Sequence, residues 1–252
     1  MSVFDTYAAF YDALYAGKDY ARECDFIEAV FARCGSRPRT LLDLACGTGG
    51  HGIELLRRGY QVCGVDQAPE MLARFAEKAK TAGLPVELLE QDLRALNPGR
   101  RFDAACCMFD AIGYLTENRD LLTTLHRLRG SLEPGGVFIC DFWHATALLR
   151  AHETTRVREF SFPGGQGLRI STTTLDPSRQ VGNVTFRVVA FRDGEPPTDI
   201  REVHPVRYFL PQEMRLFFDA AGWSVLHLCP AFELDRPIGM DDWHLVAVAT
   251  PG

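Results

Sequence analysis

The sequence has few of the features that place a protein in a membrane or on nucleic acid. No stretch approaches the roughly 18 uninterrupted apolar residues of a membrane-spanning helix. The N-terminal stretch MSVFDTYAAFYDALYAGKDY has no basic region followed by an apolar core, so it does not resemble a secretion signal. Lys and Arg number 27 against 33 Asp and Glu, and the net charge of −6 is unsuited to binding a phosphate backbone. We therefore expect a cytoplasmic protein with neither a membrane nor a nucleic acid as its partner.

The eight cysteines include no C-x-x-C pair. Most of them lie inside apolar runs, where a free thiol behaves as a small buried hydrophobe. Their spacing suits neither a disulfide framework nor a zinc site, and no other metal-ligand cluster stands out. These absences predict a reducing compartment and a protein without a bound metal.

What the chain does contain is the composition of an ordinary globular protein, with 252 residues of which 46% are hydrophobic and 24% charged. A chain of this length buries roughly 70–75% of its unfolded surface when it folds, so it needs no covalent or metal staples. One large domain, or a domain with a sizeable insertion, is expected.

Short apolar runs alternate with amphipathic stretches between residues 40 and 140. The runs are bounded by Gly, Pro, Asp or Asn and are apolar enough to be buried on both faces. They are residues 41–46, 61–66, 86–91, 102–109 and 137–142, and the helical patterns between them are residues 52–58, 69–81 and 118–132. Strands that alternate with helices in this way predict an α/β fold with a doubly wound, mostly parallel sheet.

The remaining segments have other patterns. Residues 19–34 read as one amphipathic helix, and residues 156–208 alternate apolar and polar side chains between turn sequences such as PGGQG and RDGEPP. The second segment predicts an antiparallel sheet added to the parallel one. Residues 150–210 carry nine Arg and seven Asp or Glu, and this net charge of +2 would suit an anionic or polar substrate. The chain ends with a predicted helix and two predicted strands, at residues 211–222, 223–229 and 243–250.

A glycine-rich turn follows the first predicted strand, in the sequence Asp43-Leu-Ala-Cys-Gly47-Thr-Gly49-Gly. Such a turn lets a ligand approach the backbone at the carboxyl edge of the sheet. The spacing Gly47-x-Gly49-x-x-Gly52 matches the dinucleotide-binding pattern, with Asp66 placed for a ribose, so an NAD-dependent oxidoreductase is one alternative. Asp43, however, would repel a pyrophosphate and attract a cationic ligand such as a sulfonium with an α-amino group. The residues therefore favour the cationic ligand.

This turn resembles motif I of the class I S-adenosylmethionine-dependent methyltransferases. The resemblance extends over most of the chain through Asp66-Gln67-Ala-Pro-Glu-Met71, Gln91-Asp92-Leu93, Phe102-Asp103 through Met108-Phe109, and Leu132-Glu-Pro-Gly-Gly. It implies that S-adenosylmethionine is bound and S-adenosylhomocysteine is the product. In the family the second motif's acid takes the ribose hydroxyls, its Met packs on adenine, and a later carboxylate accepts from the adenine amino group. The implied cofactor-binding residues are Tyr11, Tyr20, Asp43, Ala45, Gly47, Gly49, Asp66, Gln67, Met71, Gln91, Asp92, Leu93 and Met108.

A closer resemblance is to the small-molecule branch that includes aminosugar N,N-dimethyltransferases. It rests on Tyr11-Asp-x-x-Tyr15, Gly17-Lys-Asp-Tyr20, Met108-Phe-x-x-x-Gly-Tyr114-Leu, Asp141-Phe-Trp143-His144 and His204-x-x-Arg207-Tyr-Phe. In such enzymes N-terminal tyrosines close over the methionine half of the cofactor, and an inserted sheet covers the acceptor. The resemblance implies a helical cover at residues 1–37, a cofactor-binding core at 38–149 and 210–252, and a substrate-covering insertion at 150–209.

The acceptor side is expected where the fourth and fifth strands end, because doubly wound sheets place ligands there. Tyr15, Tyr114 and His144 are the predicted catalytic residues. Asp110, Trp143 and Arg207 are predicted to bind the acceptor, with Arg207 suited to an anionic one. Asp110 departs from the small residue that those dimethyltransferases have at its position.

The methyl group of a sulfonium is already activated, so the enzyme must align a lone pair with the C–S bond and exclude water. An amine acceptor needs only to be neutral when it attacks, whereas a hydroxyl needs a general base. The sequence has no Lys-Asp-Lys-Glu set, no Asn/Asp-Pro-Pro-aromatic stretch and no Pro-Cys nucleophile after the fourth strand, which argues against catechol and nucleobase methylation. We predict N-methylation of a small amine, such as an aminosugar or a similar secondary metabolite. O-methylation, other uses of S-adenosylmethionine and a homodimeric state stay open as alternatives.

Overall fold

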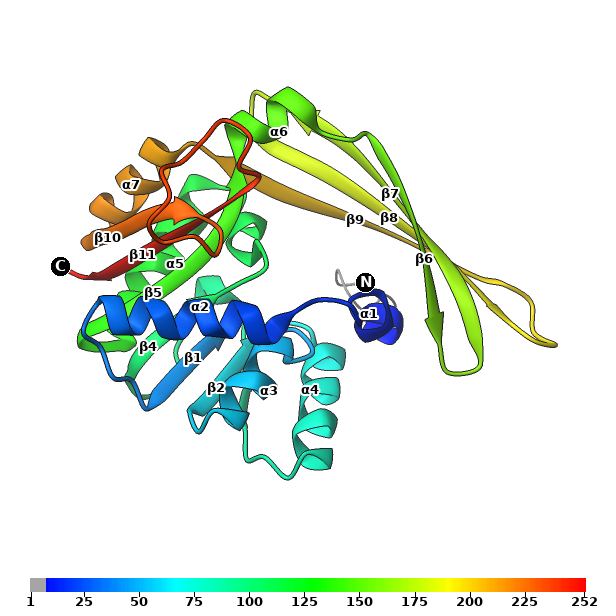
Figure 1. The fold of residues 1–252 in the computed structure, drawn as a ribbon, viewed down its shortest axis with the longest axis horizontal. Helices are drawn as coiled ribbons and strands as arrows, with labels where there is room; N and C mark the ends of the chain where they lie inside the picture. The colour runs from blue at the N-terminus through cyan, green and yellow to red at the C-terminus, as the bar shows by residue number, and fades with distance from the viewer. Residues whose placement is uncertain (1–7) are drawn as a thin grey trace.

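The computed structural model describes residues 8–252; residues 1–7, which begin both the N-terminal stretch and the 1–37 segment discussed above, lie outside the described residues. The strands of the central sheet are β1 (Thr40–Leu44), β2 (Gln61–Asp66), β3 (Glu87–Glu90), β4 (Phe102–Cys107), β5 (Leu132–His144), β10 (Trp223–Pro230) and β11 (His244–Pro251). They lie in the order β3-β2-β1-β4-β5-β11-β10 (Figure 1). Neighbours among β1 to β5 pair in parallel, and β11 is antiparallel to both β5 and β10. The prediction of a doubly wound, mostly parallel sheet is confirmed.

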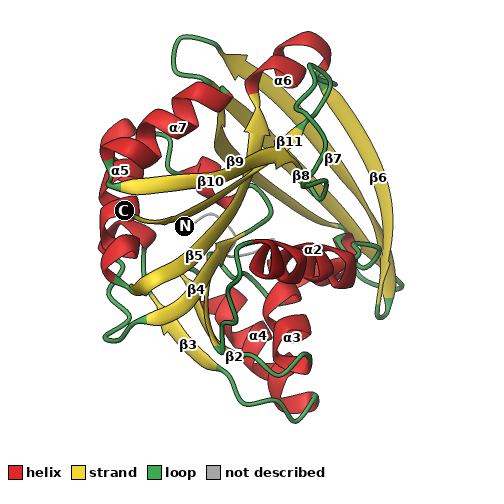
Figure 2. Ribbon diagram, turned by 60° about the vertical axis from the view of Figure 1, so that its left-hand side comes forward, coloured by secondary structure: helices red, strands yellow, loops and turns green. Residues whose placement is uncertain are grey.

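Helices cover both faces of this sheet (Figure 2). They are α2 (Tyr20–Arg33), α3 (Gly50–Arg57) and α4 (Pro69–Thr81) on one face, and α5 (Asn118–Gly130) and α7 (Pro211–Ala220) on the other. Successive strand residues point to opposite faces, so Leu41 packs with α2 and α3 while Leu42 packs with α5. The predicted helix at 118–132 is two residues too long, because Leu132 already belongs to β5.

An antiparallel sheet is inserted between β5 and α7, as the alternating pattern predicts. After α6 (Ala145–Ala151) the chain forms β6 (Thr155–Phe162), β7 (Gly165–Asp176), β8 (Val181–Arg192) and β9 (Thr198–Phe209). This inserted sheet joins the central sheet through two parallel residue pairs, Trp143 with Tyr208 and His144 with Phe209. Figure 1 shows β6 to β9 extending away from the core and arching over α1 (Ala8–Leu14).

The short helix α1 lies between the inserted sheet and the core. Phe10 and Leu14 pack against Phe160 and Val188 of the inserted sheet, whereas Ala8 packs against Met71 at the start of α4. One aromatic side of α1 is therefore held above the carboxyl ends of the central strands. None of the helices in residues 8–252 is long and apolar enough to span a membrane.

Candidate active site

A cavity of about 580 Å³ opens where the central sheet, α1 and the inserted sheet meet. Its walls come from the loops that follow β1, β2, β3 and β4, from α1, and from β6 to β9. Most residues predicted for the site line it: Tyr11, Tyr15, Ala45, Gly47, Asp66, Gln67, Met71, Gln91, Asp92, Leu93, Met108, Asp110, Tyr114 and Trp143. Tyr20, Asp43, Gly49, His144 and Arg207 do not.

Two glycines of the turn after β1 have different structural roles. Gly49 has a φ of 78°, and a Cβ there would lie 2.2 Å from the ring of Phe75, so this glycine lets α4 pack closely against the turn. Gly47 also has a positive φ, of 54°, but a Cβ there would meet no atom within 4 Å. Because Gly47 lines the cavity, its missing side chain leaves open space at the wall.

Asp43 lies beneath the turn rather than on the cavity wall. Its Oδ1 accepts a hydrogen bond from the thiol of Cys106 at 3.5 Å, and its buried Oδ2 has no partner among residues 8–252. Burial raises the pKa of Asp43 to about 6, so the carboxylate is mostly ionised at neutral pH. An incompletely paired negative charge under the turn favours a cationic ligand above it.

Asp66 connects the turn to the loop after β2. Its Oδ2 accepts from the Gly47 N–H and its Oδ1 from the Ala68 N–H, each at 2.9 Å. Burial raises the pKa of Asp66, and these two N–H groups oppose the shift by stabilising the charged form. The carboxylate is thus fixed in direction where it faces the cavity.

The loop after β3 forms the next part of the wall. Asp92 caps a short 3₁₀ helix at Leu93–Ala95, where its Oδ1 accepts from the Arg94 N–H at 2.8 Å. Its carboxylate also pairs with the Arg94 guanidinium, which holds the pKa of Asp92 below its usual range. The Gln91 side chain is held in two hydrogen bonds with the Asn97 backbone. This edge therefore presents a fixed anion beside the apolar side chain of Leu93.

Aromatic and cationic groups of three elements meet on the opposite wall. The Tyr15 ring of α1 lies 4.8 Å from Tyr11 and 5.0 Å from Phe109, centroid to centroid. Arg169 of β7 donates from Nη1 to the Tyr15 hydroxyl at 2.9 Å. Tyr15 is therefore held from both sides, by a packed ring on the core and by a guanidinium on the inserted sheet.

Tyr114 pairs with a histidine that has no assigned role in the sequence interpretation. The Tyr114 hydroxyl and Nδ1 of His204 are 2.8 Å apart, and both residues line the cavity. Burial lowers the pKa of His204 to about 4, so the ring is neutral near pH 7. His204 belongs to the stretch His204-x-x-Arg207-Tyr-Phe, which resembles the dimethyltransferases. The alternation of side chains along a strand, however, does not identify its partner.

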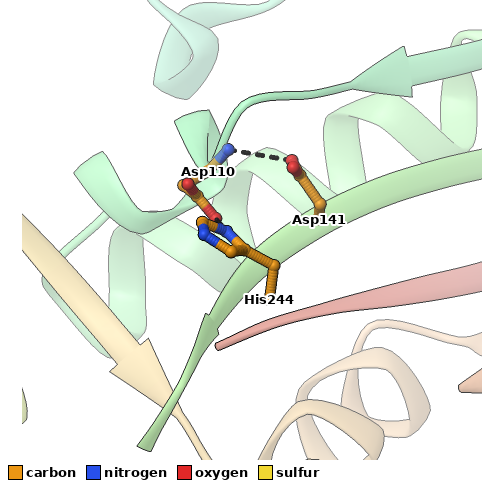
Figure 3. A group of neighbouring side chains, drawn as sticks. All are labelled: Asp110, Asp141 and His244. Carbon is orange, nitrogen blue, oxygen red and sulfur yellow. Dashed lines mark hydrogen bonds and ion pairs between the residues drawn. The ribbon is translucent and has the colours of Figure 1, made fainter. Parts of the chain in front are cut away.

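A second group missed by the sequence interpretation surrounds Asp110 (Figure 3). His244, the first residue of β11, lies 2.8 Å from Asp110 Oδ1 through its Nδ1, and the Asp110 N–H donates to Asp141 Oδ1 at 2.8 Å. The three side chains offer oxygen and nitrogen atoms within 4.8 Å of one another. One of these atoms on each residue is already used in the two hydrogen bonds. We call Asp110, Asp141 and His244 the ion-pair cluster. Asp110 raises the pKa of His244 to about 9, and burial raises that of Asp141.

Three predicted site residues have other roles in the fold. Tyr20 packs edge-on against His51 beside the turn, with ring centroids 5.0 Å apart. His144 is buried, and its Nδ1 lies 2.9 Å from the carbonyl oxygen of Asp242. Arg207 donates to Asn118 and Glu213, each at 2.6 Å, and so ties β9 to the starts of α5 and α7. None of these three residues lines the cavity, and their contact with acceptor or cofactor stays a prediction.

Comparison with known proteins places the chain in a family. A methyltransferase-domain model matches residues 41–136. The dTDP-3-amino-3,4,6-trideoxy-alpha-D-glucopyranose N,N-dimethyltransferase of Streptomyces venezuelae is 30% identical over 233 residues, covering 89% of this chain and 91% of that protein. The chain belongs to the S-adenosylmethionine-dependent methyltransferases.

Further relatives of this methyltransferase agree with that assignment. The dTDP-3-amino-3,6-dideoxy-alpha-D-glucopyranose N,N-dimethyltransferase of Streptomyces fradiae is 30% identical over 224 residues, covering 86% of this chain and 84% of that protein. The crystal structure of an S-adenosylmethionine-dependent methyltransferase from Clostridium acetobutylicum has the same fold, with a TM-score of 0.84, 22% identity and 99% of both chains covered. The methyl donor is S-adenosylmethionine, and the NAD-dependent oxidoreductase alternative is wrong.

Proposed function

We propose that this methyltransferase acts on the amine nitrogen of an amino sugar carried by an anionic group such as a nucleotide. One observation carries the proposal: a single cavity runs from the glycine turn to an arginine-bearing wall of the inserted sheet. The near full-length similarity to two amino-sugar N,N-dimethyltransferases supports the same acceptor class.

The cofactor half of the cavity suits S-adenosylmethionine. Asp66 presents a fixed carboxylate that would accept from the ribose hydroxyls, and Asp92 would accept from the adenine amino group. Met71, Leu93 and Met108 supply apolar walls for the base and the thioether. Open space at Gly47 and the buried charge of Asp43 suit the close approach of a cationic ligand.

The acceptor half of the cavity is lined by arginines other than Arg207, the one predicted from the sequence. Arg156, Arg158 and Arg169 line the cavity from β6 and β7. Arg158 also donates to the Leu14 carbonyl oxygen at 3.3 Å, which links this wall to α1. Phosphate or carboxylate oxygens on the acceptor would be held here by charge-assisted hydrogen bonds.

S-adenosylmethionine supplies an electrophilic methyl group: the acceptor's lone pair forms the new C–N bond, and the C–S electron pair stays on sulfur. The protein's own residues align the nitrogen and exclude water. Tyr15, fixed by Phe109 and Arg169, is placed to orient the acceptor, while α1 and the inserted sheet cover the cavity. Positioning of this kind contributes on the order of 7–11 kcal/mol.

The test is transfer of labelled methyl from S-adenosylmethionine to dTDP-3-amino-3,4,6-trideoxy-α-D-glucopyranose, with the 3-hydroxy analogue as the matched control. We expect a labelled amine and no labelled hydroxyl. Tyr15→Phe should lower turnover several-fold and leave the affinity for S-adenosylhomocysteine unchanged within about twofold, because the hydroxyl orients the acceptor. Labelling of the hydroxyl analogue alone would favour O-methylation, and labelling of neither would remove the amino sugar from consideration.

A further inference from the structure

The backbone after β4 is held in a conformation that L-residues rarely adopt. Phe109 has a φ of 67° and Asp110 a φ of 59°, so two consecutive non-glycine residues lie in the left-handed region. Such a backbone conformation is strained in a non-glycine residue and persists only where its surroundings impose it. The N–H of Asp110 donates to Oδ1 of the buried Asp141 side chain, and this bond holds the turn. The strained turn therefore has support from a second element, β5.

The strain directs one carboxylate toward the cavity. Only 10% of the Asp110 side chain is exposed, and Asp110 is part of the cavity wall. His244 engages Oδ1 from β11, whereas Oδ2 has no hydrogen-bond partner among residues 8–252. Figure 3 shows the His244 ring against this carboxylate and Asp141 on the side of the Asp110 backbone N–H.

The same turn also sets the position of Tyr15. Phe109 lies edge-on to the Tyr15 ring, so the residue before Asp110 contacts the aromatic wall of the acceptor side. Lys18 lies 4.3 Å from the centroid of the Phe109 ring and pairs with Glu23. The Asp110 carboxylate thus sits in the same cavity wall as Phe109 and His244, next to the place where an acceptor would meet Tyr15.

We propose that Asp110 is a catalytic residue that accepts a hydrogen bond from the acceptor's N–H through Oδ2 and removes its proton. His244 and Asp141 are positioning residues: one holds Oδ1 and balances the charge, and the other holds the backbone. This inference rests on the proposed function, since it needs an amine acceptor.

The proton balance is simple. An amine that binds as its ammonium form gives one proton to Asp110 before its lone pair can attack. After the C–N bond forms and the C–S bond breaks, the methylated nitrogen carries a positive charge. A second methyl transfer requires that nitrogen to lose another proton, which Asp110 can take once its first proton has passed to water.

Several titratable groups face this carboxylate and belong in any pH analysis. They are His244 of β11 and Asp141 of β5, with Lys18 before α2 acting at longer range on His244 and Glu23 of α2 acting at longer range on Asp141. Of these, His244 is the nearest, with its Nδ1 2.8 Å from Asp110 Oδ1.

The experiment compares pH profiles of turnover for the wild type, Asp110→Asn and His244→Gln, with dTDP-3-amino-3,4,6-trideoxy-α-D-glucopyranose as the acceptor. Asn tolerates the left-handed region, so Asp110→Asn keeps the turn. We expect this variant to lose about 10²-fold in kcat at pH 7. The loss should shrink at a pH above the pKa of the acceptor's amine, where no base is needed. Its melting temperature should fall, because the ion pair with His244 is lost, but its calorimetric affinity for S-adenosylhomocysteine should match the wild type.

His244→Gln should lower kcat several-fold and leave the acceptor's Michaelis constant unchanged within about twofold, because the Asp110 carboxylate loses the ring that holds its Oδ1. A histidine with only a structural role would lower the melting temperature without this selective loss of kcat. Asp199→Asn is the matched control, since Asp199 pairs with Arg187 on the exposed side of the inserted sheet, and it should leave every readout unchanged.

The possible results separate the two proposals. If the wild type methylates no amine, the proposed function fails, and the role of Asp110 fails with it. If the wild type methylates the amine and Asp110→Asn keeps its kcat at pH 7 within about threefold, the role of Asp110 alone is wrong. An equal loss of kcat at every pH would also overturn it, because that result indicates damage to the site rather than loss of a base.

Discussion

Asp66 receives two backbone N–H groups from two different loops, and it is the carboxylate on the cofactor side whose direction is best fixed. Asp66→Asn keeps the size of the side chain but removes the charge and one acceptor. We expect the affinity for S-adenosylhomocysteine to fall about tenfold or more, since a charge-assisted pair is worth about 1.5–3 kcal/mol. Isothermal titration calorimetry measures it. Asp235→Asn, which affects only a surface pair with Arg33, is the control.

The ion-pair cluster of Asp110, Asp141 and His244 makes the free energy of unfolding fall as the pH rises. His244 has a pKa of about 9, raised chiefly by Asp110, and Asp141 a pKa of about 8, raised by burial. Both groups hold their protons more tightly in the folded chain than in the unfolded one, where the imidazole pKa is about 6.5. The free energy of unfolding should therefore fall as the pH rises from 6.5 to 9.

Asp141→Asn should reduce this fall by at least about 1 kcal/mol, because the substituted side chain has no proton to lose. Urea unfolding at pH 6.5, 7.5 and 9 measures the effect. Equal slopes for the variant and the wild type would show that Asp141 stays ionised in the folded protein.

The location of a single residue could be predicted where its position relative to a strand end determines which side of the sheet it reaches. Asp66 ends β2 and Asp92 follows β3, and the carboxyl ends of parallel strands meet at one edge, so both line the cavity. Arg207 and His144 also follow from strand position, but their partners come from α7 and from the segment before β11. Alternation along a strand says which face a residue takes, and it cannot say which neighbour meets it there. Arg169 and His244 escaped notice for the same reason.

Among the elements, Arg207 shows how the inserted sheet is anchored. Its side chain is 6% exposed and bonds to Asn118 and Glu213, which start α5 and α7. Arg207→Met should destabilise the fold by about 3–5 kcal/mol, because it leaves the Glu213 carboxylate with only neutral donors, the Gln180 side chain and the Leu210 N–H. Chemical denaturation gives this number. The acceptor's Michaelis constant should stay unchanged, and the double variant Arg207→Met, Glu213→Leu should recover part of the loss.

The bounds of most helices and strands in the core lie close to those predicted from the sequence. The helix at residues 69–81 is predicted to the residue, because Pro69 suits a first turn and Gly83 a chain reversal. β5 begins five residues before its predicted start, because Leu132 pairs with Phe102 and the strand continues through a register shift that holds Pro134 and Gly135 before Val137 pairs with Ala104. The Pro and Gly that are typical of a turn therefore form an irregularity within the strand rather than its boundary.

For the whole molecule, the simplest prediction concerns ligand-linked stability. S-adenosylhomocysteine at about 100 times its dissociation constant should add about 2.7 kcal/mol. For a chain of this size that raises the melting temperature by roughly 5–10 °C. Differential scanning fluorimetry with NAD as the control ligand tests the cofactor directly, and a shift with NAD alone would contradict the family assignment.

The narrow junction at Trp143–Tyr208 and His144–Phe209 has an evolutionary consequence. Beyond it, the strands at 155–209 pair only with one another, so substitutions there leave the hydrogen-bond register of the central sheet undisturbed. Lineages can diverge in the wall that faces the acceptor while they inherit the donor pocket intact. Proteins with this architecture can therefore acquire new substrates through substitutions in β6 to β9 alone.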